Sequence, residues 1–326
     1  MDSRAGVPSV KLGIGSLGGG VVEQDIKNSV LQWGMTAPKL TVIEVAGGKN
    51  DPTDQDSNVE NMLDLLPTMS FTWWWLTGTA ADITMCFGPN ASGGMTAVTN
   101  ALVKAGVKVG SWSWGSAASS WDPAERGELA LAFKNAVESG CTFCAASGDN
   151  SADDGTSSPS TDYPCSDPNV WAVGGTRLRL RQDGTILKET AWGDGRPGDE
   201  GGGGGIDPTV LMQKWQQGIV LGTHRGAPDS SANADPRSGW QMSANGGWMT
   251  VGGTSAASPF TAALIAVARA FHKQNAGLLT PNAYASRATP FRDIRLGSNG
   301  DKATLGWDEA TGLGSPNGAA FMDALR

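Results

Sequence analysis

Short apolar runs alternate with stretches whose apolar residues recur every three or four positions through the first half of the chain. The runs predict strands at residues 10–17, 40–45, 83–88, 107–115 and 142–148. The periodic stretches predict helices at residues 21–33, 58–66, 95–104 and 123–138. Strands that alternate with helices favour an α/β fold with a mainly parallel central sheet and helices on both faces.

Ligands of such sheets bind beyond the carboxyl ends of the strands. Two predicted strands end in segments that carry polar side chains, SWSWG at residues 111–115 and AASGDN at residues 145–150. These two segments are therefore the first candidates for chemistry.

The pattern changes after Gly174. Residues 177–181 and 185–189 flank Gln182-Asp183-Gly184 and predict a β-hairpin. A long apolar helix is predicted from Ser255 onward, and glycine-rich and acidic loops follow it. Because no internal repeat or domain linker is visible, we expect one domain over residues 1–326.

Composition excludes several classes of protein. The 326 residues carry a net charge of −8, and 17 % of them are charged. No basic patch stands out, so neither nucleic acid nor an anionic membrane is an expected partner. The longest apolar region, residues 260–271, is too short to span a bilayer and predicts a buried helix. The first residues have no charged start followed by an apolar stretch, so no signal peptide is expected.

The segment GGTSAASP, residues 252–259, is the strongest chemical signal. Ser255 stands between small residues at the start of the long helix, where a substrate backbone can approach and developing negative charge is favoured. An ordinary helix-capping serine is the alternative. A serine nucleophile usually needs a histidine base, but the only two histidines do not suit the role. His224 lies in a loop bounded by glycine and proline, and His272 lies several turns beyond Ser255.

Carboxylates offer a substitute for histidine. Glu60 and Asp64 are spaced i and i+4, which places them on one face of a helix. Two close carboxylates repel, so we expect the pKa of one to rise and that of the other to fall. The ionised partner can then accept a serine proton. Asp149, at the end of a predicted strand, could donate to an oxyanion, form a turn or bind a metal.

Taken together, these residues resemble the sedolisins, the serine-carboxyl peptidases. The resemblance covers nearly the whole chain and includes ExxLD at residues 60–64, SGD at 147–149, GTSAASP at 253–259 and GWDEATGLGSPN at 306–317, in the family's order. It implies a subtilisin-like fold in which Glu60 takes the proton of Ser255, Asp64 orients Glu60, and Asp149 donates to the oxyanion.

The resemblance also implies how the substrate is held. The edge at residues 111–115, with Ser111, Ser113, Trp114 and Gly115, would pair with the substrate backbone. Asp162 matches a family pocket residue and would favour a basic side chain. Expected partners are a peptide or an unfolded protein, together with the protein's own propeptide. We expect a monomer that is secreted or works in an acidic compartment.

A single structural calcium ion is implied in the C-terminal loops, at about residues 290–316. Its ligands would be the carboxylates of Asp293 and Asp308 and the backbone carbonyls of Ile294, Thr304 and Gly306. Hard oxygen ligands of this kind suit Ca²⁺. Thr304 stands where many members have glycine.

Three features depart from the family or leave alternatives open. Ser16 stands where some members extend the carboxylate network with a glutamate. Trp73-Trp74-Trp75 either line a substrate cleft or close a surface gap. The four cysteines are expected to be buried thiols, with one disulfide as the alternative. A bond within the pair Cys141 and Cys144 is not expected, because strand residues three apart point to opposite faces.

The sequence therefore predicts an acid-acting endopeptidase or tripeptidyl-peptidase. Histidine is a cation in acid, whereas a glutamate with a pKa of about 4.3 can still act as a base. A catalytically silent relative that binds peptides is one alternative. A glycosidase with paired carboxylates is another, but it leaves the serine segment unexplained.

Overall fold

The computed structural model describes residues 10–75, 81–156, 159–195, 199–272, 277–287 and 289–325. A single sheet lies at the centre of the molecule, with strand order β12-β8-β6-β4-β1-β3-β2. These strands are parallel, and β9 joins β8 in antiparallel orientation. Their bounds are β1 Lys11–Ser16, β2 Lys39–Glu44, β3 Asp82–Phe87, β4 Val109–Trp112, β6 Thr142–Ala146, β8 Val170–Leu180, β9 Ile186–Ala191 and β12 Ser230–Asn233.

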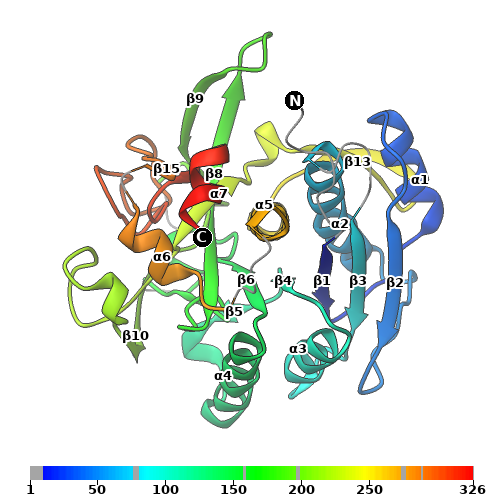
Figure 1. Ribbon diagram of the computed structural model, residues 1–326, viewed down its shortest axis with the longest axis horizontal. Coiled ribbons are helices and arrows are strands. Elements are labelled where there is room, and N and C mark those ends of the chain that lie inside the picture. The colour runs from blue at the N-terminus through cyan, green and yellow to red at the C-terminus, as the bar shows by residue number, and fades with distance from the viewer. Residues whose placement is uncertain are drawn as a thin grey trace.

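Helices cover both faces of the sheet (Figure 1). On one face, α5 contacts β4, β6, β8 and β12 and packs along α2. On the other face, α3 contacts β1 and β3, and α4 contacts β6. The bounds are α1 Glu23–Gln32, α2 Gln55–Trp75, α3 Gly94–Lys104, α4 Pro123–Glu138 and α5 Thr254–His272. Burial of the sheet from both sides explains why its strands appear in the sequence as short continuous apolar runs. The predicted α/β class with a parallel sheet is confirmed.

Smaller elements surround this centre. The predicted hairpin is present as β8 and β9, which project from the sheet (Figure 1). The other elements are β5 Ser116–Ala117, β7 Asp162–Tyr163, β10 Gly205–Leu211, β11 His224–Ala227, β13 Trp240–Ala244, β14 Gly247–Val251, α6 Thr280–Ala285, β15 Phe291–Arg292, β16 Ser315–Pro316 and α7 Gly318–Ala324.

Helix α2 is longer than the sequence predicts, because it continues through Pro67 to Trp75. The hydroxyl of Thr68 donates to the carbonyl of Asp64 at 3.0 Å in the turn that contains the proline. At the end of α2, Trp75 packs edge-on against Phe271 of α5 at 6.1 Å between ring centroids. Trp74 is 69 % exposed. Trp75 therefore packs against α5, the Trp73 indole donates to the Thr36 hydroxyl at 3.3 Å, and none of the three tryptophans lines the cavity described below.

Helix α5 has the length and apolar composition of a membrane span. However, 83 % of its most apolar stretch of 18 residues is buried inside the protein. The predicted buried helix is confirmed, because the core of the protein covers its apolar surface.

All four cysteines are free and buried. The prediction of buried thiols is confirmed, and the alternative of one disulfide is not found. Burial raises the pKa of Cys86 and of Cys141 to about 12. These thiols are side chains of the core with no nucleophilic character near neutral pH.

Candidate active site

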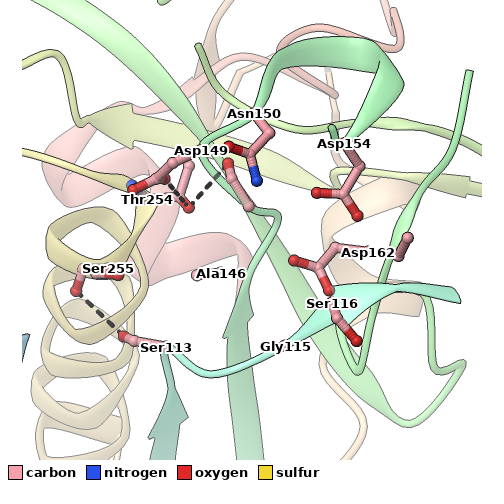
Figure 2. A pocket seen from close by; sticks show the side chains of 12 residues that line it. Ser113, Gly115, Ser116, Ala146, Asp149, Asn150, Asp154, Asp162, Thr254 and Ser255 are labelled. Atoms are coloured by element: carbon pink, nitrogen blue, oxygen red, sulfur yellow. Dashed lines mark hydrogen bonds between the residues drawn. The ribbon is translucent and has the colours of Figure 1, made fainter. Parts of the chain in front are cut away.

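Segments from several elements meet at one end of the sheet and form a cavity of about 270 Å³. The segments after β4 and β6 contribute Ser113 and Asp149, and the start of α5 contributes Thr254 and Ser255. Figure 2 shows Ser255 on one side of this cavity and Asp149 above it. The cavity lies beyond the carboxyl ends of β4 and β6, as expected for a parallel sheet.

Ser255 occupies the second position of α5 and is 7 % exposed. The Glu60 carboxyl on α2 lies near enough to Ser255 for a hydrogen bond from the serine side chain to lower its pKa. The side-chain atom Oε1 of Glu60 has no hydrogen-bond partner among the residues that the structure describes. A carboxyl that faces a serine hydroxyl and retains a free oxygen is positioned to accept its proton.

Asp64 lies one helical turn beyond Glu60 and is fully buried. Its Oδ1 accepts a hydrogen bond from the Ser113 hydroxyl at 2.5 Å. The same hydroxyl lies 3.3 Å from the Ser255 carbonyl oxygen, the contact drawn in Figure 2. Ser113 therefore links α2 to the first turn of α5.

The pKa values of this carboxyl pair differ from the sequence expectation. Burial, opposed by the Ser255 hydrogen bond and reinforced by the charge of Asp149, raises the pKa of Glu60 to about 7. Burial and the charge of Glu60 raise the pKa of Asp64 well above its usual value. The expectation that one pKa rises while the other falls is wrong, and the glutamate value of about 4.3 does not apply to Glu60. Both carboxyls are desolvated, and no cation contributes to the shift of either.

Asp149 faces the start of α5. Its Oδ1 accepts hydrogen bonds from the backbone N–H and the hydroxyl of Thr254, both at 2.7 Å. Burial raises the pKa of Asp149, although the Thr254 bonds oppose this shift. Sequence reasoning missed Thr254, although the first backbone N–H groups of any helix lack a partner within the helix and need an acceptor such as this carboxyl.

The other oxygen of Asp149 explains a glycine of the serine segment. A Cβ atom at Gly253 would lie 2.6 Å from Asp149 Oδ2, and Gly253 has φ +145°. Only glycine fits this close approach and this backbone conformation. Asp149 Oδ2 is thereby held beside the residue two positions before Ser255.

The predicted substrate edge is only partly exposed to the cavity. Ser113 and Gly115 line it, and Trp114 lines a neighbouring cavity of about 480 Å³ that also contains Gly115. Ser111 does not fit the prediction, because it lies within β4 between β1 and β6 and its hydroxyl contacts Ser258 at 2.9 Å. Its position in the centre of the sheet leaves it no edge to offer to a substrate.

Neither histidine approaches the cavity. The His224 ring contacts the Thr223 hydroxyl at 3.1 Å in β11, and the His272 ring contacts the Met322 carbonyl at 3.0 Å at the far end of α5. Ser16, which stands where some sedolisins have a glutamate, is fully buried and donates to the Gly18 carbonyl at 2.9 Å. The indole Nε1 of Trp114 has no partner among the described residues. Among the described residues that line the cavity, the titratable side chains are therefore all carboxyls.

The residues expected to bind calcium lie together in the C-terminal loops. Asp293 Oδ1 accepts from the Gly306 N–H at 3.2 Å, and Asp308 Oδ2 accepts from the Thr304 N–H at 2.8 Å. Arg295 donates to the second oxygen of Asp293 at 2.6 Å. Within the described ranges, no group of three or more histidine, cysteine, aspartate or glutamate side chains could hold a metal ion. A cation here would depend on backbone carbonyls besides the two carboxylates.

The chain is similar in sequence to known peptidases. The model of the subtilase family (Peptidase S8) matches residues 44–314. Kumamolisin from Bacillus sp. is 33 % identical over 95 % of this chain and 58 % of its own length. Sedolisin from Pseudomonas sp. is 33 % identical over 60 % of this chain and 36 % of its own length. The chain thus spans little more than half of the first relative and about a third of the second.

Solved structures agree in fold. Pseudomonas sedolisin, described as a serine-carboxyl proteinase complexed with two molecules of pseudo-iodotyrostatin, superimposes with a TM-score of 0.88 at 27 % identity and covers 99 % of this chain and 94 % of its own. Sphericase superimposes with a TM-score of 0.59 at 20 % identity and covers 96 % of this chain and 94 % of its own. The second likeness concerns the fold alone.

Proposed function

The chain belongs to the subtilase family and, within it, to the sedolisins, and on this basis we propose that it hydrolyses peptide bonds in acid as a serine-carboxyl peptidase. The observation that carries the proposal is that Ser255 and Asp149 line one cavity, whose described lining residues include no histidine, while the Ser255 side chain acts on the Glu60 carboxyl as a hydrogen-bond partner. Substrates are peptides or unfolded proteins, cleaved in endopeptidase or tripeptidyl-peptidase mode.

In the proposed reaction, Ser255 Oγ attacks the scissile carbonyl carbon while Glu60 takes the hydroxyl proton. The negative charge passes to the carbonyl oxygen, where protonated Asp149 donates a hydrogen bond. Collapse of this intermediate breaks the C–N bond, and Glu60 returns the proton to the leaving amine. Water then attacks the acyl-enzyme, with Glu60 taking the water proton and returning it to Ser255 as the second product leaves.

The raised pKa of Asp149 supports this assignment, because an ionised carboxylate would repel the oxyanion. The pKa of Glu60 sets the acid limit of activity, since a protonated glutamate cannot accept the serine proton. With that pKa at about 7 in the free protein, little base is ionised in strong acid. Activity in acid therefore depends on how the Glu60–Asp64 pair shares its remaining proton.

The substrate backbone would run in extended form along residues 113–115. Gly115 is exposed beside the cavity, and Asp162 closes its far side. We propose that Asp162 favours a basic side chain on the residue before the scissile bond. A propeptide is a further proposed partner, and a secreted or acidic location is the proposed site of action.

We also propose one structural calcium ion held by the carboxylates of Asp293 and Asp308 and the carbonyls of Ile294, Thr304 and Gly306. The contacts of Asp293 with Gly306 and of Asp308 with Thr304 support it, because they gather these oxygen donors in one loop region. When bound, the ion would supply cross-linking of the loops and no chemistry at Ser255. Arg295 would have to leave one oxygen of Asp293.

The proposed activity is tested by digesting an acid-denatured protein with the wild type and with Ser255→Ala, and by identifying the peptides by mass spectrometry. We expect new peptides from the wild type alone. Circular dichroism on the same samples shows whether Ser255→Ala is folded. Equal cleavage by a folded Ser255→Ala variant would remove the nucleophile, and no cleavage by the wild type across the acid range would contradict the function.

A further inference from the structure

Two carboxyls lie across the cavity from Ser255, and only one of them, Asp162, takes part in the proposed function. Asp162 belongs to β7, and Asp154 follows the short helical turn Ser151–Asp153. They are 6 % and 9 % exposed. Figure 2 shows both side chains pointing into the same part of the cavity. Asp162 Oδ1 and Asp154 Oδ2 have no hydrogen-bond partner among the described residues.

Gly148 shows how close these carboxyls are. A Cβ atom on Gly148 would lie 2.9 Å from Asp162 Oδ2 and 3.3 Å from Asp154 Oδ1. Both carboxyls therefore converge on the same glycine, which has φ +93° and presents no side chain between them. A Cβ atom on Gly115 would lie 2.5 Å from Asp162 Oδ1. This oxygen therefore also lies close to the residues proposed to pair with the substrate backbone.

No positive charge compensates this pair. The residues that line the cavity, as far as the structure describes them, include no lysine, arginine or histidine. The charges of Asp153 and Asp149 act on Asp154, and those of Asp154 and Asp149 act on Asp162. Asn150, as a hydrogen-bond partner, lowers the pKa of Asp154, and the charge of Asp162 raises the pKa of the buried Cys165 thiol. Two desolvated carboxyls with free oxygens either retain a proton or receive a cation.

We propose that Asp154 is a second specificity-determining residue, which acts with Asp162 as a paired-carboxyl site for the cationic side chain of the substrate residue before the scissile bond. The proposal rests on the peptidase function proposed above. The lysine ammonium group has three donors and no acceptor, which matches two neighbouring carboxyls that each keep an unpartnered oxygen.

The pair makes this preference depend on pH. Burial, opposed by the Asn150 bond and reinforced by neighbouring acids, raises the pKa of Asp154 to about 6. Burial and the charges of Asp154 and Asp149 raise the pKa of Asp162 well above its usual value. In strong acid both carboxyls are neutral and a cation gains little. As the pH rises through about 6 the site becomes anionic, so discrimination in favour of lysine increases.

The test compares two internally quenched peptides that differ only in lysine or norleucine before the scissile bond. Their kcat/KM ratio is measured between about pH 4 and about pH 7, which brackets the ordinary and the raised carboxyl pKa values. We expect the lysine peptide to gain about tenfold over the norleucine peptide across this range, the size of a hydrogen bond to a charged group. The ionisation of Glu60 and Asp149 and the reactivity of Ser255 change kcat/KM of both peptides alike, so these changes cancel in the ratio.

Asp154→Asn should reduce the ratio and flatten its pH dependence, and Asp162→Asn should do the same. Asp183→Asn removes a charge in the exposed turn between β8 and β9, away from the residues that line this cavity, and should leave the ratio as in the wild type. A wild-type ratio and pH dependence in Asp154→Asn would overturn the role of Asp154. Wild-type enzyme that cleaves both peptides equally at every pH would overturn the paired site alone, whereas wild type that cleaves neither would contradict the peptidase function and this inference with it.

Discussion

The Ser113 hydroxyl donates to Asp64 Oδ1 at 2.5 Å, and it is the only donor to this fully buried carboxyl among the residues that the structure describes. This bond lowers the pKa of Asp64 against the larger effects of burial and of the Glu60 charge. Ser113 therefore adjusts how the Glu60–Asp64 pair shares its proton.

Ser113→Ala should raise the pKa of Asp64 further. A more protonated Asp64 repels Glu60 less, so Glu60 should ionise at a lower pH and the acid limb of kcat/KM should move down. We also expect kcat to fall about tenfold, because Asp64 loses the contact that orients it. The full pH profile measures both effects.

Ser116→Ala is the matched control, because this hydroxyl lines the same cavity but contacts Ser120 at 3.1 Å and no carboxyl. It should leave the acid limb in place. If Ser113→Ala only lowers the melting temperature and its acid limb coincides with that of the wild type, Ser113 has a structural role alone.

Asp149 should produce the alkaline limb of activity. Its raised pKa means that it is protonated at low pH and loses its proton as the pH rises. We expect a bell-shaped profile whose acid limb follows Glu60 and lies above the glutamate reference of about 4.3, and whose alkaline limb follows Asp149. Asp149→Ala should lower kcat by roughly a hundred- to thousandfold, the usual effect of losing one oxyanion donor. A profile without an alkaline limb would contradict a protonated Asp149.

Asp149→Asn separates donation from burial. The amide can donate without a titratable proton, so this variant should retain more activity than Asp149→Ala and its alkaline limb should move up or disappear. Equal loss in both variants, with the limb unchanged, would assign Asp149 to holding Thr254 in place.

Folding stability should be greatest in acid. A buried acid whose pKa is raised in the folded protein contributes stability that is fully present below its unfolded pKa, about 4, and is lost as the pH rises through its folded pKa. That folded value is about 6 for Asp154 and about 7 for Glu60, and the pKa values of Asp162 and Asp64 are raised as well. We expect the melting temperature to fall by several degrees between about pH 4 and about pH 8, because a tenfold difference in proton affinity between the folded and unfolded states corresponds to about 1.4 kcal/mol.

The double variant Asp154→Asn/Asp162→Asn should have a shallower dependence, because two of the contributing acids are gone. Asp183→Asn, in the exposed turn of the β8–β9 hairpin, should follow the wild type. A melting temperature that rises toward neutral pH would contradict the raised pKa values.

Calcium should stabilise the folded chain without taking part in the reaction. A ligand that binds only the folded state stabilises it by about 2.7 kcal/mol at a hundredfold excess over Kd. Removal with EGTA should therefore lower the melting temperature of the wild type. Asp308→Asn should melt at the EGTA value with or without calcium, and Asp183→Asn should respond as the wild type does. An unchanged wild-type melting temperature, with no calcium in elemental analysis, would remove the site.

Several features of this protein follow from the sequence alone, because they depend on spacing within one element. The bounds of α4 agree with the predicted helix, since Pro123 occupies its first turn and Asp122 caps it by accepting from two backbone N–H groups. The spacing of Glu60 and Asp64 places both carboxyls on one face of α2 by helix geometry. Ser255 stands at a helix start because small residues precede a long apolar run.

Tertiary structure decided what those side chains contact and how they ionise. Ser111 lies at a predicted strand edge, but β4 is paired on both sides and buries it. Asp149 and Thr254 are 105 residues apart in sequence and Asp64 and Ser113 are 49 apart, yet each pair shares a hydrogen bond. Asp154 belongs to none of the sequence motifs, and only folding of the chain places it beside Asp162. Spacing along a chain fixes direction within a helix or strand, whereas burial and neighbouring charge, which set a pKa, depend on segments that meet only after folding.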